Sequence, residues 1–170
     1  MKNNTMNKVI IIGCPGSGKS TFSKALHEKT GLPLYHLDML YWNSDRTTVS
    51  KELFRERLQK VIEENQWIID GNYGSTIEMR MIQCDTVILF DLPTEVCLQG
   101  VTERIGKERY DLPWLETELD PEFRQFIEDF PKDTLPYIYE LIEKYKDEKR
   151  IIIFKSREES DEYLKTLRKS

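Results

Sequence analysis

The stretch Gly13-Cys-Pro-Gly-Ser-Gly-Lys-Ser20 decides the fold, since it matches the phosphate-loop pattern GxxxxGK followed by Ser or Thr at every fixed position. It comes directly after a β-branched run at residues 9–12 and directly before residues 21–29, whose composition suits a helix. In this context the backbone N–H groups of the loop and the positive end of the helix face a bound phosphate. The residues predicted to bind ATP here are Gly13, Pro15, Gly16, Ser17, Gly18, Lys19, Ser20 and Thr21.

Two residues of this loop carry the chemistry of phosphoryl transfer. Lys19 is predicted to reach the β- and γ-phosphates and to act in catalysis, and the Ser20 hydroxyl is a candidate ligand of Mg²⁺. Mg²⁺ in such sites also needs a carboxylate at the end of a neighbouring strand. Asp70 and Asp91 each end an apolar run, so the residues alone leave both candidates open.

Short apolar runs alternate with helical patterns along the whole chain. After residues 9–12, further runs occupy residues 34–37, 67–69, 86–90 and 150–154. Residues 50–64 place apolar side chains at helical spacing, and Ser156 with Glu159 forms a capping box that opens a last helix. Because the strands are apolar throughout, we expect an α/β fold of the P-loop NTPase kind, with a five-stranded parallel sheet and helices on both faces.

The chain is predicted to be one domain over residues 1–170, because no repeat, low-complexity tract or Pro/Gly/Ser-rich linker divides it. Its composition changes between the fourth and fifth strands, where an acidic segment is punctuated by Pro113, Pro121 and Pro131. An insertion at this point lies at one end of the sheet, where mobile lids are found. We therefore predict a lid at about residues 105–136.

The composition limits the partners. A formal net charge of -5 provides no basic face for nucleic acid, so no direct nucleic-acid partner is expected. The apolar runs are too short to cross a membrane, and the three scattered cysteines support neither a disulfide framework nor a zinc site. We expect a cytoplasmic protein, a monomer by default, whose partners are a nucleotide and a small-molecule acceptor.

Five blocks of the sequence resemble known kinases. The blocks are GCPGSGKST (residues 13–21), HLDMLYW (36–42), WIIDGNYG (67–74), DTVILFDLP (85–93) and IIIFKSR (151–157). Together they resemble nucleoside monophosphate kinases of the adenylate-kinase type and, more closely, the kinase-like group named topology modulation proteins. The resemblance spans most of the chain.

The resemblance implies the strand order 2-3-1-4-5, a lid between the fourth and fifth strands, and an acceptor-side segment at about residues 38–66. It implies ATP and Mg²⁺ as cofactors. It favours Asp70 over Asp91 beside the metal, because adenylate kinases carry an Asp-Gly pair at that strand end, as this chain does. It also implies that Lys155 and Ser156 lie along the adenine.

The lid departs from this family in its cations. Arg109-Tyr110-Asp111 stands where the nearer group carries an Arg-Pro pair. Arg104, Lys107 and Arg109 remain as clustered cations on the lid side, and Arg104 and Arg109 are predicted to be catalytic. A nucleotide-binding regulator without turnover therefore stays open as an alternative to a kinase.

The acceptor is predicted to be a nucleoside monophosphate, with a small hydroxyl compound as the alternative. An anionic acceptor needs cations rather than a base, whereas a hydroxyl acceptor needs a carboxylate near the attacking oxygen. Asp38, just past the second strand, is the candidate base. The other residues predicted to bind the acceptor are Arg57 and Arg80 as cations, and Trp42 and Tyr73 as flat apolar surface for a base.

Overall fold

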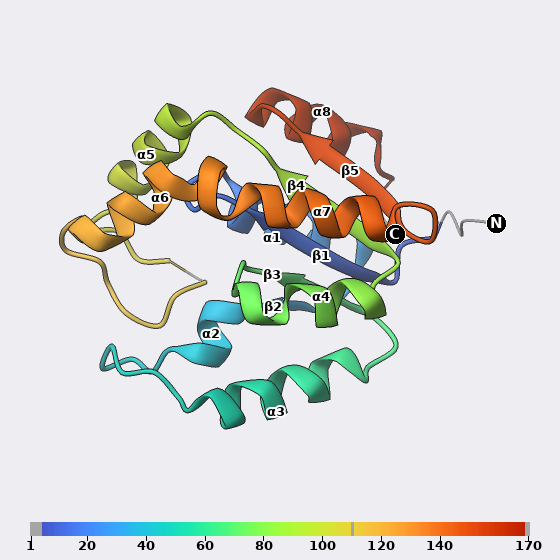
Figure 1. Ribbon diagram of the computed structural model, residues 1–170, viewed down its shortest axis with the longest axis horizontal. Helices are drawn as coiled ribbons and strands as arrows, with labels where there is room; N and C mark the ends of the chain where they lie inside the picture. The colour runs from blue at the N-terminus through green and yellow to red at the C-terminus, as the bar shows by residue number, and fades with distance from the viewer. Residues whose placement is uncertain (1–4, 110, 169–170) are drawn as a thin grey trace.

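The computed structural model describes residues 5–109 and 111–168, and its core is a five-stranded parallel sheet (Figure 1). The strands are β1 (Lys8–Gly13), β2 (Leu34–His36), β3 (Trp67–Asp70), β4 (Thr86–Phe90) and β5 (Arg150–Phe154). They lie in the order β2-β3-β1-β4-β5, and each neighbouring pair is parallel. The predicted fold class and strand order are confirmed.

Strand β1 lies at the centre of the sheet because its side chains are apolar on both faces. Residues 9–12 are fully buried, and Ile10 pairs with Ile69 of β3 on one side and with Val87 of β4 on the other. The phosphate loop therefore starts from a buried strand that is paired on both sides.

Helices cover both faces of the sheet, with α4 and α7 in front of it and α1 behind it in Figure 1. Helix α1 contacts β1, β2 and β3, whereas α4 contacts β1 and α7. Within the described ranges, no helix is both long and apolar enough to cross a membrane. The helices are α1 (Lys19–Thr30), α2 (Leu37–Tyr41), α3 (Lys51–Ile62), α4 (Gly74–Gln83), α5 (Thr94–Glu103), α6 (Pro121–Asp133), α7 (Leu135–Tyr145) and α8 (Arg157–Thr166).

The second strand is shorter than predicted. It ends at His36, and Leu37 begins helix α2 while remaining fully buried. A short apolar run does not distinguish a buried strand from a buried helical turn, which explains the error. Asp38 consequently lies in the first turn of a helix at the carboxyl end of β2.

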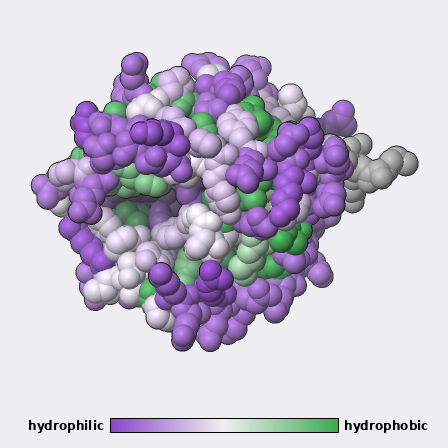
Figure 2. All heavy atoms as spheres, in the orientation of Figure 1, coloured by the Kyte–Doolittle hydropathy of each residue, from purple (hydrophilic) through white to green (hydrophobic). Residues whose placement is uncertain are grey.

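The carboxyl ends of β1, β2 and β3 bring together the phosphate loop, α2 and residues 71–73. These ends lie on the left in Figure 1, where the chain between α5 and α6 also passes near α2. In the space-filling view of Figure 2, the surface is hollowed between α6 and α2 on this same side. This edge of the sheet is where an open α/β fold binds its ligands.

The predicted lid range contains two kinds of structure. Residues 105–120, Tyr110 excepted, form turns and bends without a helix or strand. Residues 121–133 form α6, whose Ile127 and Phe130 are 0% and 2% exposed and belong to the hydrophobic core. Because α6 is held by buried side chains at helical spacing, it packs as part of the core, and the predicted lid stays a prediction for residues 105–120.

Candidate active site

The phosphate loop is held in shape from two sides. The side-chain amide of Asn72, just after β3, accepts a hydrogen bond from the Gly13 N–H at 3.0 Å and donates one to the Gly13 carbonyl at 2.7 Å. Gly16 has a φ of +82°, and a Cβ there would lie 2.1 Å from the Cys97 carbonyl of α5. Only glycine fits at that position. The loop is therefore held between Asn72, which follows β3, and helix α5.

The loop presents polar groups that suit a phosphate. The Lys19 Nζ donates to the Cys14 carbonyl at 3.2 Å, and burial lowers the pKa of Lys19. Among the described residues, no carboxylate forms an ion pair with this ammonium. The buried Ser17 Oγ likewise has no hydrogen-bond partner there. An ammonium without an ion-pair partner and a hydroxyl without a hydrogen-bond partner both fit a bound phosphate, whose oxygens would supply the missing partners.

A cavity of about 600 Å³ opens over the phosphate loop. Its wall combines the loop and α1 with the end of α5, the start of the lid and α8. Lining residues include Lys19, Ser20, Thr21, Gly100, Arg104, Arg109, Asp111, Arg157 and Ser160. Its size and mixed polar lining are typical of a small-molecule site.

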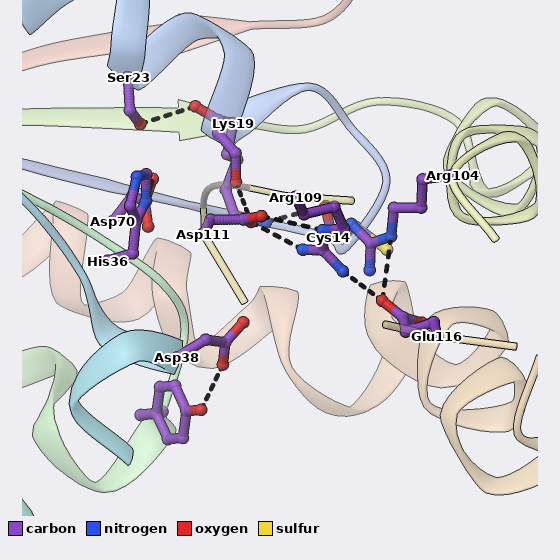
Figure 3. Close-up of polar contacts among 12 residues, drawn as sticks. Cys14, Lys19, Ser23, His36, Asp38, Asp70, Arg104, Arg109, Asp111 and Glu116 are labelled. Carbon is purple, nitrogen blue, oxygen red and sulfur yellow. Dashed lines mark hydrogen bonds and ion pairs between the residues drawn. The ribbon is translucent and has the colours of Figure 1, made fainter. Parts of the chain in front are cut away.

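Asp38 lies on the acceptor side of this edge, where it accepts a hydrogen bond from the Tyr73 hydroxyl. Burial raises the pKa of Asp38, and the charge of Asp111 adds to that rise, whereas the Tyr73 hydrogen bond opposes it. Figure 3 shows the Asp38 carboxylate directed toward the centre of the site. A partly buried carboxylate with a raised pKa suits proton transfer.

Asp70, at the end of β3, is paired with a histidine. Its Oδ2 lies 2.7 Å from His36 Nδ1, and the side chains of His36 and Asp70 are only 10% and 7% exposed. Burial opposes protonation of His36, but the hydrogen bond and charge of Asp70 outweigh it and raise the histidine pKa.

A carboxylate from the segment between α5 and α6 reaches the phosphate loop itself. Asp111 accepts a hydrogen bond from the Ser20 hydroxyl and two more from Arg109, at 2.9 and 2.7 Å. Burial would raise the pKa of Asp111, but Arg109 outweighs it and lowers that pKa to about 2. Arg109 also bonds Glu116, and the Arg104 Nε lies 3.6 Å from the same glutamate (Figure 3).

The two arginines predicted to bind the acceptor differ in their burial. Arg80 is fully buried and donates to the carbonyls of Gly71 and Asn72, so its predicted contact with an acceptor is wrong for this structure. Arg57 is half-buried, and its Nη1 donates to the Leu40 carbonyl at 2.9 Å. Both guanidinium groups stabilise the backbone, because each satisfies carbonyl groups near the acceptor segment.

The predicted adenine and aromatic residues also have structural contacts. Ser156 accepts from the Glu159 N–H and caps α8, and the Lys155 ammonium lies 2.5 Å from the Asp91 carboxylate. Asp91 also accepts a hydrogen bond from the Tyr139 hydroxyl. The Trp42 ring packs edge-on against Trp114 of the lid, with 5.8 Å between ring centroids.

Three residues that bond the phosphate loop were not predicted from the sequence. Asn72 holds Gly13, Arg157 donates to the Gly16 carbonyl at 2.9 Å, and Asp111 bonds Ser20. Arg157 lies next to the predicted Ser156, and Asp111 lies two residues after the predicted Arg109, so both were adjacent to signals. Their partners lie at least 90 residues away in the sequence, which no local pattern reveals.

Comparisons with known proteins place the chain among P-loop kinase folds. The chain matches no protein-family model. An adenylate kinase from Thermotoga neapolitana is 26% identical over 131 residues, which cover 58% of this chain and 59% of that protein. The chain thus spans less than two thirds of the length of that curated relative.

Several solved kinases share the fold over almost the whole chain. Shikimate kinase from Acinetobacter baumannii, in complex with shikimate, has a TM-score of 0.63 and 17% identity, covering 95% of this chain and 93% of that one. A gluconokinase from Sinorhizobium meliloti has a TM-score of 0.58 and 12% identity, covering 96% and 90%. The fold and the phosphate loop define a P-loop kinase fold. The finer resemblance to topology modulation proteins stays a prediction.

Proposed function

We propose that this chain is an ATP-dependent phosphotransferase whose acceptor is a hydroxyl group of a small molecule. The observation that carries the proposal is Asp38: a partly buried carboxylate with a raised pKa that shares the site with Lys19. Of the two arginines expected beside an acceptor phosphate, Arg80 is buried in the body of the protein, and Arg57 donates to the Leu40 carbonyl. The geometry therefore favours a base over a second phosphate-binding cluster.

The nucleotide is held by the phosphate loop. Its backbone N–H groups and the N-terminus of α1 orient the phosphates, and Lys19 offsets their charge as it builds up in the transition state. The described residues contain no group of three acidic, His or Cys side chains that could hold a metal ion. Mg²⁺ would therefore be held by the nucleotide phosphates and the Ser20 hydroxyl, where it neutralises charge on the transferred group.

Asp38 is proposed to take the acceptor proton. As the acceptor oxygen forms its bond to the γ-phosphorus, the bond from that phosphorus to the β,γ-bridging oxygen breaks, and the hydroxyl proton passes to a carboxylate oxygen of Asp38. The Tyr73 hydroxyl holds the carboxylate in position. Burial raises the pKa of Asp38 and so makes it a stronger base than an exposed aspartate.

Residues 105–120 are proposed to act as a lid over this reaction. Their contacts reach across to the acceptor segment: Arg46 donates to the Leu115 carbonyl at 2.9 Å, and its guanidinium lies 4.7 Å from the centre of the Trp114 ring. Trp42 packs against the same ring. A lid held by the acceptor segment would exclude water when the acceptor is bound.

A nucleoside monophosphate remains the second candidate acceptor. The partial sequence likeness to an adenylate kinase favours it, as does the aromatic surface of Tyr41, Trp42 and Tyr73. A regulator without turnover is the third candidate, because the lid cations Arg104 and Arg109 are already paired with acids.

ATP consumption with two panels of acceptors tests the proposal. One panel holds small polyols and hydroxy acids, and the other holds nucleoside monophosphates. Turnover is expected with a member of the first panel, and Asp38→Asn should lower kcat by about 10²–10⁴-fold, which is the usual contribution of positioned proton transfer.

Asp45→Asn is the matched control, because Asp45 lies on the same segment but is fully exposed and bonds only its own turn among the described residues. It should leave kcat unchanged. Turnover with nucleoside monophosphates that persists in Asp38→Asn and is lost in Arg57→Ala would support the second candidate instead. ATP binding without turnover in either panel would support the regulator.

A further inference from the structure

The phosphate-loop serine is bonded to an unexpected carboxylate. The resemblance to adenylate kinases favours strand-end Asp70 as the acid beside the metal. The Ser20 hydroxyl instead donates to Asp111, which lies 91 residues further along the chain. In Figure 3, Asp70 lies beside His36, and Asp111 lies apart from them beside Arg109. The two carboxylates therefore occupy different surroundings at the same end of the sheet.

We propose that Asp111 of the lid, and not Asp70 of β3, is the carboxylate that serves the magnesium side of the phosphate loop. The inference rests on the proposed function, because it names a residue that would position Mg²⁺ for ATP in that same site. It also makes the metal site depend on the lid, since the carboxylate arrives with residues 105–120.

The hydroxyl chemistry of Ser20 supports this assignment. A serine hydroxyl has one proton to donate and two lone pairs. Donating the proton to Asp111 fixes the rotation of the hydroxyl and leaves its lone pairs for a cation. A neighbouring carboxylate that accepts a ligand's proton orients the ligand and increases its affinity for a metal. Asp111 meets this requirement directly.

The charge of Asp111 is fixed by Arg109. Two hydrogen bonds from this guanidinium, at 2.9 and 2.7 Å, hold both carboxylate oxygens. Asp111 is 6% exposed, and the guanidinium of Arg109 supplies the positive charge that balances its carboxylate. Arg109, predicted as a catalytic cation, thus positions an anion next to the phosphate loop.

Asp70 is engaged elsewhere. One of its oxygens lies 2.7 Å from His36 Nδ1, and both side chains are almost completely buried. To orient a metal ligand through that oxygen, Asp70 would have to break its hydrogen bond to the buried His36, which costs free energy. This second observation is independent of the lid and points to the same assignment.

A second possible role for Asp111 predicts a different effect on ATP binding, which makes the proposal testable. If the carboxylate only occupied the place of the nucleotide phosphates, its negative charge would compete with ATP, and removing that charge would tighten ATP binding under all conditions. If it positions Mg²⁺, removing the charge would weaken only the binding that depends on the metal.

Calorimetric titration of ATP in excess Mg²⁺ and in EDTA separates these roles without any measurement of activity. For the unaltered chain, Mg²⁺ should tighten ATP binding. Asp111→Asn should lose about 10–100-fold in affinity in Mg²⁺, the usual effect of removing such an orienting partner, while its affinity in EDTA is retained. Asp70→Asn should keep the effect of Mg²⁺. Glu116→Gln is the matched control, because Glu116 is the other acidic partner of Arg109.

Several outcomes would overturn the inference. Loss of the magnesium effect in Asp70→Asn but not in Asp111→Asn would return the role to β3. Tighter ATP binding by Asp111→Asn in both conditions would identify a competing anion. Either result leaves the proposed kinase intact, whereas an unaltered chain that binds no ATP in Mg²⁺ or in EDTA overturns the function and the inference together.

Hydrogen exchange of the unaltered chain provides a second measurement that needs no variant to fold. Because Mg²⁺ would recruit Asp111, exchange in residues 105–120 should be slower with ATP and Mg²⁺ than with ATP and EDTA. Equal exchange in the two conditions would contradict the proposal.

Discussion

Arginines predicted to face an acceptor phosphate occupy different environments in the structure. Arg80 is fully buried and bonds the backbone after β3, whereas Arg57 is half-buried on α3 and bonds the end of α2. Arg109 bonds two lid carboxylates. The same side chain thus stabilises a loop, joins two helices or orients an anion, and its burial and partners decide which.

Arg80→Met should destabilise the protein strongly. The change keeps much of the side-chain volume but removes the donors to the Gly71 and Asn72 carbonyls and to Thr76. Buried acceptors that lose a donor cost about 1–3 kcal/mol each, so we expect the free energy of unfolding to fall by about 3–5 kcal/mol. Urea denaturation measures this change.

Arg57→Met is the control for Arg80→Met, since its single bond to the Leu40 carbonyl lies near the surface. It should cost about 1 kcal/mol or less. Equal losses in the two variants would mean that burial does not distinguish the two arginines.

At the scale of elements, the packing of α5 against the phosphate loop sets the shape of the nucleotide site. Gly16 of the loop and Gly100 of α5 face each other so closely that a Cβ on Gly100 would lie 2.1 Å from the Gly16 carbonyl and 2.7 Å from Arg157. Two glycines allow the backbones to meet directly, which fixes the loop before any nucleotide binds.

Gly100→Ala should displace the phosphate loop. Because the obstructing Gly16 atom is backbone, α5 or the loop has to shift. Overpacking of this kind costs about 1–3 kcal/mol. We also expect weaker ATP binding, measured by calorimetry alongside thermal unfolding.

Gly74→Ala provides the comparison for Gly100→Ala, because a Cβ on that helical residue would meet nothing within 4 Å. It should leave stability and ATP affinity nearly unchanged. Unaltered ATP affinity in Gly100→Ala would show that the contact with α5 does not hold the loop.

At the scale of the whole molecule, nucleotide binding and folding are linked because the phosphate loop extends from β1, the buried central strand of the sheet. Asn72, just after β3, bonds Gly13 of the loop. Gly16 of the loop packs against α5 and accepts a hydrogen bond from Arg157 of α8. A ligand that binds only the folded loop therefore stabilises the entire sheet rather than one segment.

ATP with Mg²⁺ at about 100 times its dissociation constant should stabilise the fold by about 2.7 kcal/mol. For a chain of this size, the melting temperature should rise by roughly 5–10 °C. Lys19→Ala should remove most of that rise, because the ammonium that offsets the phosphate charge is lost. Differential scanning calorimetry with and without nucleotide measures both values.

Lys60→Ala, an exposed change on α3, is the control for Lys19→Ala and should keep the full rise in melting temperature. A parent protein whose melting temperature does not respond to millimolar ATP and Mg²⁺ would contradict nucleotide binding by this loop.

The sequence by itself determined the parallel sheet and the phosphate loop, and it predicted an insertion between β4 and β5. Each of these depends on neighbours along the chain: a buried β-branched run, the spacing of glycines in residues 13–20, and the acidic composition between Asp111 and Asp133. Signals of this kind can be recognised in one sequence alone, because they depend only on residues that are close together in the chain. The end of β2 was misplaced because a four-residue apolar run fits a strand and a helical turn equally well.

Only the tertiary structure decided which polar side chains meet. The pairs Ser20 with Asp111, His36 with Asp70, and Arg157 with Gly16 join residues 91, 34 and 141 positions apart. A charged residue in an acidic segment looks the same in sequence whether it faces solvent or a phosphate loop. The burial of such a residue and the identity of its partner decide its charge and its role. Both are set only when folding brings distant segments together at the carboxyl ends of the strands.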